Sequence, residues 1–539
     1  MQTLILIALF ALLLFGSREL HAQTPDPIAA LQTQAATTNT SPWGHWGPNP
    51  EKYSSWTTHT NRLIPAYIFG GDFKRVAGER SIYRSAEAIE KLYGFLPTET
   101  VNPQAQYFDQ TDIFRMQKWA AESGKKRIIL FVFDGMDWHT TRAAAIHKTG
   151  AVQYDSGRGQ GLAFQDYRGV KTDFGYFVTS PHDEGTNTNV DKQIVTRPGQ
   201  ILGGYSAALC GPAPWGPITD AKYPIATSDT LKHAYSDSAS SATSMCSGIK
   251  TYNDAINVDD KGREVLPIAR TLQEQGYAIG VVTSVPISHA TPACAYANNV
   301  HRDDYQDLTR DLIGRPSVFH PGGLQGVDVL IGGGFGIAND KDGPQGENFV
   351  VGNRYLTADD LAAIDTANGG KYVIAQRTSG EIGTKVLDNA VKSASSEKKR
   401  LFGYFGVAGG HLPFQTADGG YDPVLSVGNA EAAKAEKYSP EDLTENVNLS
   451  EMAVAAARVL QARSDKWWLM VEAGDVDWAN HSNNIDNSIG AVLSGDAAFK
   501  KMTAWIENNG GWDDTLVILT ADHGHYLVLE HPEALAVRK

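Results

Sequence analysis

Cysteine is scarce in this chain of 539 residues, which contains Cys210, Cys246 and Cys294 and no others. Three thiols cannot all pair within one chain, so the sequence allows either one disulfide with a free thiol or three buried thiols. The spacing of the three cysteines matches no zinc motif. A fold that depends on a disulfide framework is therefore excluded.

Hydrophobic runs long enough to cross a membrane are also missing. The one candidate, residues 3–15, is too short and lies too close to the amino terminus to span a bilayer. It is followed by Leu20-His21-Ala22, an acceptable cleavage site, although no lysine or arginine precedes the run. This pattern predicts a secretory signal peptide over residues 1–22 and a periplasmic or secreted protein, with an uncleaved N-terminal anchor as the alternative.

The chain also lacks an excess of positive charge, and its formal net charge is −14. This balance argues against nucleic acid as the main partner. It repels anionic substrates at long range, so an anion-binding site would need local cations, either metal ions or arginine. The apolar content of 42% and the charged content of 20% are those of a soluble globular protein.

What the sequence does contain is an alternation of helical patterns and short apolar runs. The runs suit strands buried on both faces of a parallel sheet. Strands are predicted at 127–133, 278–283, 327–331, 467–471 and 515–519, and helices at 112–121, 266–275, 449–463 and 488–508, the last interrupted at Ser494-Gly495. Residues 23–85 show little periodicity and predict an irregular wrapping segment. The alternation predicts the α/β class with a mostly parallel sheet.

Acidic residues and histidines collect where these strands end. Asp134 follows the first strand, Glu472 and Asp477 follow the fourth, and Asp522-His523 follows the fifth. Taken singly, such residues are more often helix caps or surface ion pairs. Ligands of parallel sheets bind beyond the carboxyl ends of the strands, and carboxylates mixed with imidazoles suit divalent metals. Asp477 and His481 are four residues apart, so one helical turn places both on one face. Together these residues indicate a metal site.

A stretch of small and hydroxylated residues, 235–259, stands apart from the alternation. At its centre, Asp237 is followed by Ser238 and then by Ala, Ser and Thr. Taken alone, such a segment is more often a loop or a helix cap than a nucleophile. Small side chains nevertheless let the backbone approach a ligand closely, and free N–H groups at a helix start attract anions. The stretch is therefore a candidate phosphate site.

Several motifs resemble those of the alkaline phosphatase family, in family order, over residues 127–534. Asp237–Thr243, continuing into 247–253, resembles the nucleophile motif of that family. The other motifs are Phe133-Asp134-Gly135-Met136, His289-Ala-Thr291, Arg302, the run 329–334, Val471-Glu472 with Asp477 and His481, and Thr520-Ala521-Asp522-His523. The resemblance implies a large sheet flanked by helices on both faces, in one domain over 23–539 with insertions at about 151–230 and 410–445.

The resemblance also implies an activity, a set of cofactors and a role for each residue. Phosphate monoesters would be hydrolysed through a phosphoserine on Ser238, with Arg302 gripping the phosphate and Asp237 orienting Arg302. The implied metal sites are one Zn²⁺ on Asp134, Asp522 and His523, a second Zn²⁺ on Asp477 and His481, and one Mg²⁺ on Asp134, Thr291 and Glu472. His525 would steady a ligand without binding metal. Small phosphomonoesters are the implied substrates, and a homodimer is possible because family members are commonly dimers.

The sequence departs from the family pattern at several places. His289 and Trp478 stand where enteric bacterial members carry aspartate and lysine, so weaker Mg²⁺ retention is expected. The family completes its leaving-group zinc with a histidine well beyond the Asp522-His523 motif, whereas this chain ends at Lys539. We expect a C-terminally truncated sequence of an active enzyme, or else a compromised two-ligand site.

The rival functions are a phosphodiesterase or sulfatase of the same superfamily, and a non-catalytic phosphate- or metal-binding protein. The sulfatase signature is absent, since Ser238 is followed by Ala-Ser-Ser-Ala. Arg302 favours a monoester, because it would bind oxygens that a diester has esterified.

Overall fold

A ten-stranded sheet forms the centre of the protein in a computed structural model that describes residues 26–55, 59–225, 233–427 and 435–537. The predicted signal peptide, residues 1–22, lies outside the described residues. In sheet order the strands are β14 (Tyr372–Gln376), β15 (Arg400–Tyr404), β11 (Val329–Gly333), β10 (Ala278–Pro286), β16 (Trp467–Ala473), β4 (Arg127–Phe133), β17 (Thr515–Thr520), β2 (Ile64–Phe69), β5 (Thr172–Val178) and β3 (Phe108–Asp109).

The strands from β14 to β17 are all parallel, and β2 alone is antiparallel to both of its neighbours. The parallel α/β class predicted from the apolar runs is confirmed. The predicted strand at 127–133 has the observed bounds of β4, and the other four predicted strands overlap β10, β11, β16 and β17.

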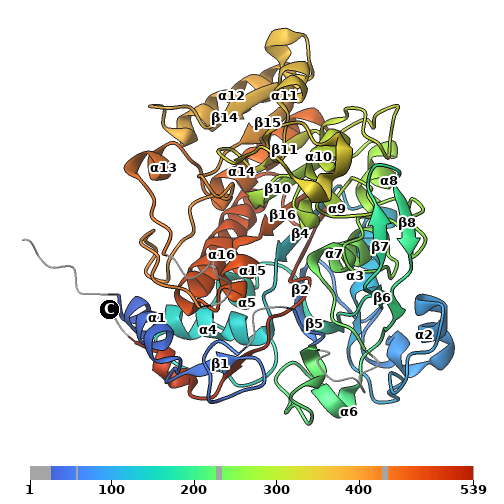
Figure 1. Cartoon of the computed structure of the whole chain (residues 1–539), viewed down its shortest axis with the longest axis vertical. Coiled ribbons are helices and arrows are strands. Elements are labelled where there is room, and N and C mark those ends of the chain that lie inside the picture. Colours follow the sequence, from blue (N-terminus) through green and yellow to red (C-terminus); the bar gives the residue numbers. More distant parts are fainter. Residues whose placement is uncertain (1–25, 56–58, 226–232, 428–434, 538–539) are drawn as a thin grey trace, which may run out of the picture.

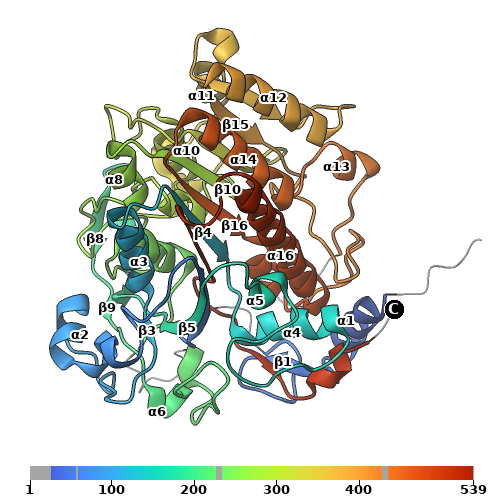
Figure 2. The same ribbon diagram turned by 180° about the vertical axis from the view of Figure 1, so that it is seen from behind.

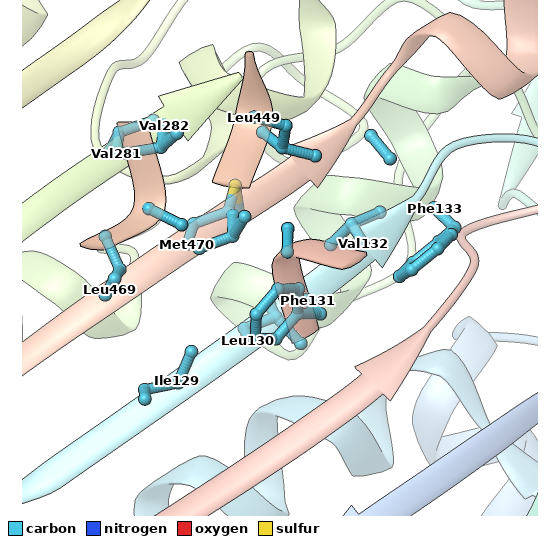
Figure 3. Packing of buried hydrophobic residues seen from close by; sticks show 14 of the residues in the cluster. Ile129, Leu130, Phe131, Val132, Phe133, Val281, Val282, Leu449, Leu469 and Met470 are labelled. Carbon is cyan, nitrogen blue, oxygen red and sulfur yellow. The ribbon is translucent and has the colours of Figure 1, made fainter. Parts of the chain in front are cut away.

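The core lies along β4 and β16, whose side chains are buried on both faces of the sheet. Every residue of these two strands is buried. Figure 3 shows Leu130, Phe131 and Val132 of β4 packed near Leu469 and Met470 of β16. Burying such side chains stabilises the fold by about 1.5–3 kcal/mol each. The central strands therefore provide a rigid base for the residues that follow them.

Helices cover both faces of the sheet (Figures 1 and 2). One layer contains α12 (Gly383–Glu397), α14 (Leu449–Arg463) and α16 (Ile485–Asn508). The opposite layer contains α3 (Gln110–Glu122), α7 (Ser238–Ser247), α8 (Ile268–Glu274) and α9 (Ala290–Cys294). The remaining longer helices are α1 (Pro27–Thr38), α2 (Ala86–Tyr93), α4 (Trp138–Thr149), α10 (Tyr305–Ile313), α11 (Ala358–Ile364) and α15 (Asp475–His481).

Two local expectations were wrong. The helix predicted at 488–508 is not interrupted at Ser494-Gly495, because α16 continues through both residues. Gly495 is needed there for close packing: a Cβ at this position would lie 2.2 Å from the ring of Phe133. The N-terminal segment is not wholly irregular either, since it contains α1, β1 (Gly44–Trp46) and the sheet strand β2. Pro65, which is unusual inside a strand, obscured β2 in the sequence.

The two stretches expected as insertions differ in character. Residues 151–225 contain β5 of the central sheet, α5 (Ala163–Asp166), α6 (Ala207–Cys210) and two small antiparallel pairs, β6 (Asp183–Glu184) with β9 (Gln200–Ile201) and β7 (Asn187–Asn189) with β8 (Ile194–Arg197). Residues 410–427 and 435–445 are mostly irregular, apart from α13 (Pro440–Thr444). That either stretch is an insertion stays a prediction.

The two ends of the described chain lie against each other. β1 pairs with β18 (Leu527–Leu529) in an antiparallel ladder, and the amide of Thr60 donates to the carbonyl of Gly524 at 2.9 Å. The three cysteines are buried free thiols, which decides between the two alternatives left by the sequence. No helix among the described residues combines the length and the apolar character needed to cross a membrane.

Candidate functional site

The predicted site residues meet at the carboxyl ends of the parallel strands. Asp134 directly follows β4, Glu472 lies near the end of β16, and Asp522 lies two residues beyond β17. These three strands are neighbours, so their ends converge at one edge of the sheet. Asp477 and His481 lie in the short helix α15, and Ser238 is the first residue of α7. The sheet therefore fixes the positions of the Asp134, Glu472 and Asp522 carboxylates, and α15 fixes that of Asp477.

The start of α7 is set by Asp237, which caps the helix and accepts a hydrogen bond from the amide of Ser240 at 2.8 Å. Capping by aspartate is among the strongest helix-start signals. All ten residues of α7 are buried, because the small side chains let the helix pack closely under α3 and α9. Ser238 is therefore held at a helix N-terminus, where backbone N–H groups favour an anion.

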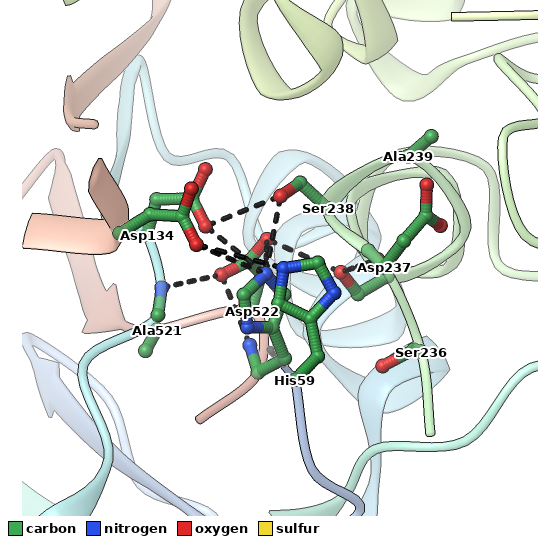
Figure 4. Close-up of polar contacts among 12 residues, drawn as sticks. His59, Asp134, Ser236, Asp237, Ser238, Ala239, Ala521 and Asp522 are labelled. Atoms are coloured by element: carbon green, nitrogen blue, oxygen red, sulfur yellow. Dashed lines mark hydrogen bonds and ion pairs between the residues drawn. The ribbon is translucent and has the colours of Figure 1, made fainter. Parts of the chain in front are cut away.

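One group of potential metal ligands surrounds the Ser238 hydroxyl. The Nε2 of His523 lies 3.2 Å from Asp134 Oδ1 and 3.6 Å from Asp522 Oδ2. The Oγ of Ser238 lies 3.3 Å from Asp134 Oδ1 and 3.1 Å from His523 Nε2. Ligands of a tetrahedral zinc at 2.0–2.1 Å lie about 3.3–3.4 Å apart, so these separations fit such an ion. Figure 4 shows Ser238 pointing toward Asp134.

A second group surrounds Asp477 Oδ1. The Nε2 of His481 lies 3.4 Å from this oxygen, and the Nε2 of His59 lies 3.6 Å from it. The two imidazole nitrogens, of His59 and His481, are 3.1 Å apart. His525 lies closer, and its Nε2 is 2.7 Å from Asp477 Oδ1, which is a hydrogen-bond distance. His59, Asp477, His525 and His523 offer donor atoms that all lie within 4.8 Å of one another. His481 adjoins this group through His59 and Asp477.

Three buried oxygen atoms form a third group of potential metal ligands, which consists of oxygen alone. Asp134 Oδ2, Thr291 Oγ1 and Glu472 Oε1 have no hydrogen-bond partner among the described residues. Asp134 and Glu472 interact electrostatically, and Thr291 lies close enough to Glu472 to influence its pKa. Buried polar atoms are normally hydrogen-bonded, so orphaned oxygens need another partner. An oxygen-only set suits Mg²⁺, and the residues present fit such an ion.

Burial and mutual repulsion raise the pKa values of several carboxyl groups in the site. Burial raises the pKa of Glu472 to about 8, against a hydrogen bond from Thr283. Burial and the neighbouring Asp134 raise the pKa of Asp522 to about 8. The pKa of Asp134 is raised by burial and by the charges of Asp477 and Glu472. Carboxylates gathered in this way need nearby cations to stay ionised at neutral pH.

Asp477 behaves differently because histidines surround it. Burial acts to raise its pKa, but the neighbouring His481, His525 and His59 hold that pKa well below the usual range. Burial in turn lowers the pKa of His59 well below its ordinary value and that of His525 to about 3. These two imidazoles are therefore neutral, which is the form that binds metal.

Arg302 provides positive charge on the other side of Ser238. Its Nη1 donates to Asp237 Oδ2 at 3.0 Å. Burial acts to raise the pKa of Asp237, but Arg302 keeps that pKa below its usual value. Asp237 thus serves twice, capping α7 with one oxygen and holding the guanidinium with the other. Arg302 lines the same cavity as Ser238.

A cavity of about 880 Å³ opens onto this site. Its lining includes Ser238, Arg302, His289 and Trp478, as well as Arg354. His289 is half-buried, and desolvation with the nearby Arg302 lowers its pKa to about 3. A volume of this size holds a small organic molecule.

Comparison with known proteins identifies the family. A family model for alkaline phosphatase matches residues 219–533, which is more than half of the chain. The chain belongs to the alkaline phosphatase family. It is 28% identical over 295 residues to alkaline phosphatase 4 of Bacillus subtilis, a match that covers 55% of this chain and 50% of that protein.

Other relatives extend the comparison. The chain is 30% identical over 301 residues to the repressible alkaline phosphatase of Saccharomyces cerevisiae, covering 55% of this chain and 46% of that protein. It is similar to the crystal structure of the Thermus thermophilus alkaline phosphatase with a TM-score of 0.44 and 21% identity, over 74% of this chain and 60% of that one. The chain spans about half the length of the curated relatives it matches first.

The structure brings together every site residue that the resemblance to alkaline phosphatases implied. These are Ser238, Asp237, Arg302, Asp134, Thr291, Glu472, Asp477, His481, Asp522 and His523. Their individual roles stay predictions. The sequence assigned two ligands to the group at Asp477, whereas the structure places a further imidazole, His59, beside them.

Sequence reasoning missed His59 because it lies in a segment without periodicity, 422 residues before His481. It also lies outside the residues that match the alkaline phosphatase family model. A lone histidine in such a segment carries no metal-binding signal of its own. The approach of His59 to the site is visible only when the fold is known.

Proposed function

We propose that this protein hydrolyses phosphate monoesters to an alcohol and inorganic phosphate through a phosphoserine on Ser238. The observation that carries the proposal is the position of the Ser238 Oγ, between Asp134 Oδ1 and His523 Nε2 at the start of α7. A hydroxyl at a helix start, beside metal-ligand candidates and an arginine, is suited to attack an anionic phosphorus centre.

The proposal includes two zinc ions and one magnesium ion. Asp134, Asp522 and His523 would hold one zinc ion, and Asp477 with His481 would hold the other. Asp134, Thr291 and Glu472 would hold magnesium. Divalent ions at these sites supply Lewis-acid chemistry and concentrated positive charge, which phosphoryl transfer from a monoester requires.

The residues of the chain itself would perform the following steps. Arg302, fixed by Asp237, binds two non-bridging phosphate oxygens with its planar fork and orients phosphorus toward Ser238. Ser238 Oγ loses its proton and forms a bond to phosphorus while the ester P–O bond breaks and the alcohol leaves with a proton. Water then attacks the phosphorus of the phosphoserine while the Ser238 P–O bond breaks; one water proton passes to Ser238 Oγ, and the hydroxyl leaves as part of inorganic phosphate.

We also propose a periplasmic or secreted location and a homodimer. The location is supported by the apolar N-terminal run and the cleavage site after it. The homodimer is supported by the family resemblance alone.

The test is release of phosphate from a simple aryl phosphate at alkaline pH by the full chain supplied with zinc and magnesium. We expect turnover that a chelator abolishes, and a loss of about 10³-fold or more in Ser238→Ala. The Ser244→Ala variant, in the same helix but remote from Asp134, serves as the matched control and should keep wild-type turnover. Phosphate binding without turnover in the folded wild type would instead indicate a non-catalytic binding protein.

A further inference from the structure

His59 reaches the site from the N-terminal part of the chain. We define the N-terminal arm as the described residues 26–55 and 59–69, which include α1, β1 and β2. The arm is joined to the carboxyl-terminal part of the chain by the β1–β18 ladder, by the Thr60–Gly524 hydrogen bond and by the pairing of β2 with β17. These contacts hold β1, β2 and Thr60, the residue directly after His59, in place. The histidine side chain is therefore positioned by the fold.

The positions of three donor atoms point to a shared metal ion. His59 Nε2, His481 Nε2 and Asp477 Oδ1 form a triangle with sides of 3.1, 3.4 and 3.6 Å. Ligands of a tetrahedral zinc lie about 3.3–3.4 Å apart, so all three sides fit one face of such a tetrahedron. Catalytic zinc sites normally have three protein ligands and keep the fourth position open. The triangle borders the cavity that contains Ser238.

The neighbouring histidines have other roles in this geometry. His525 Nε2 is hydrogen-bonded to Asp477 Oδ1 at 2.7 Å, as expected of a residue that orients a ligand. His523 Nε2 is 3.9 Å from Asp477 Oδ1 but 3.2 Å from Asp134 Oδ1, which places it in the other group. His59 is buried, and its Nε2 lies 3.1 Å from His481 Nε2 and 3.6 Å from Asp477 Oδ1.

We propose that His59 is the third protein ligand of the metal ion held by Asp477 and His481, so that metal binding fastens the N-terminal arm to the rest of the site. This proposal rests on the metal-dependent function proposed above, but it concerns metal binding and not turnover. A metal ion that binds tightly only when the N-terminal arm is docked stabilises the docked arm by mass action. The arm, which lies outside the family-matched residues, thereby becomes part of the site.

A direct test replaces His59 by cysteine in the full chain and adds Co²⁺ in place of zinc. A thiolate bound to Co²⁺ gives an intense charge-transfer absorption in the near ultraviolet, so His59→Cys should show this band and the wild type should not. The matched control is His45→Cys, because His45 is also a buried histidine of the arm but lies in β1 beside Glu530. Bound cobalt without the band in His59→Cys would overturn the proposal.

A second experiment measures zinc affinity and the docking of the N-terminal arm. In His59→Gln, we expect one zinc ion to bind at least about 100-fold more weakly, with the His45→Gln control unchanged. Metal should slow hydrogen exchange of residues 44–46 and 64–69 in the wild type, and this protection should be lost in His59→Gln. Equal zinc affinity and equal protection in the two variants would contradict the proposal. None of these readouts depends on phosphate release, so a failure of the proposed catalytic function would be seen separately.

Discussion

Arg302 shows how much of this site depends on the chemistry of a single side chain. Its guanidinium is held by Asp237 at 3.0 Å, and it lines the cavity that contains Ser238. A planar fork binds two oxygens of a phosphate at once, whereas an ammonium group binds as a point charge. The identity of this cation therefore matters as well as its charge.

We expect Arg302→Lys to weaken inhibition by inorganic phosphate and to raise KM by about 10-fold or more, since a hydrogen bond to a charged group contributes about 1.5–3 kcal/mol. The measurement is the inhibition constant for phosphate with an aryl phosphate substrate. Arg354→Lys is the matched control, because Arg354 lines the same cavity but is paired with Asp342 at 2.7 Å. Equal phosphate inhibition in wild type and Arg302→Lys would contradict this role.

His289 provides a second test at the scale of a residue. Its Nδ1 is buried without a hydrogen-bond partner among the described residues, and desolvation lowers its pKa to about 3. A neutral imidazole adds no negative charge beside Thr291 and Glu472. We expect His289→Asp to bind Mg²⁺ about 10-fold more tightly or better, because a nearby opposite charge contributes on the order of 1 kcal/mol or more. Calorimetric titration with Mg²⁺ decides, and unchanged affinity would refute the expectation.

At the scale of elements, helix α16 contains a buried carboxyl group that is not part of the site. Asp486, in its first turn, accepts a hydrogen bond from the amide of Ala417 at 3.0 Å, and its Oδ2 is buried without a partner among the described residues. Burial raises its pKa to about 7, with Asp26 before α1 and Asp418 adding to the shift. The folded state therefore retains a proton that the unfolded chain releases at an ordinary pKa of about 4.

This difference gives a pH dependence of known sign. Between about pH 4 and 7 the folded state binds more protons than the unfolded state, so Asp486 makes the free energy of unfolding fall as pH rises. In Asp486→Asn this slope should be shallower by up to about 1.4 kcal/mol per pH unit. Denaturant unfolding across this pH range measures the slope. Asp359→Asn, an exposed carboxyl in α11, should leave the slope unchanged; the same slope in both variants would show that Asp486 is not the group responsible.

Elements with a strong apolar pattern were predictable from the sequence. β4 and α14 have the predicted bounds, because one is a continuous buried run and the other is a regular amphipathic helix between Asn448 and Ser464. β2 was not predictable, since it contains Pro65 and owes its place to pairing with β17 and β5. Its stability comes from tertiary contacts that local sequence does not encode.

The same distinction holds for the site. Asp134, Glu472 and Asp522 were predictable because they follow buried strands whose ends must converge in a parallel sheet. His59 was not, because its approach to Asp477 depends on how an aperiodic segment crosses the fold. The contacts of strand ends follow from topology, whereas those of a wrapping segment follow only from the folded structure.

At the scale of the whole molecule, the buried carboxyl groups link metal content to stability. Asp134, Glu472 and Asp522 lie on or just after β4, β16 and β17, whose ends meet at one edge of the sheet, and Asp477 lies in α15, which follows β16. Without cations these groups repel one another or bind protons, as the raised pKa values of Glu472 and Asp522 show. A metal ion at 1,000 times its Kd stabilises the folded state by about 4 kcal/mol.

We therefore expect chelation to lower the thermal unfolding midpoint by on the order of several degrees, and zinc with magnesium to restore it. Scanning calorimetry before and after dialysis against a chelator makes the comparison. The Ser238→Ala variant should respond as the wild type does, because all proposed metal ligands remain. An unfolding midpoint that is insensitive to the chelator would mean that these carboxyl groups do not hold stabilising ions.

The most direct test of the proposed mechanism is to trap the phosphorylated enzyme. The full chain with zinc and magnesium would be mixed with a phosphate monoester, quenched in acid and digested, and the peptide that contains Ser238 analysed by mass spectrometry. We expect one phosphoryl group on Ser238, and none on that peptide in Ser238→Ala or after chelation. Steady turnover of the wild type with no phosphate on Ser238 at any quench time would contradict a phosphoserine mechanism.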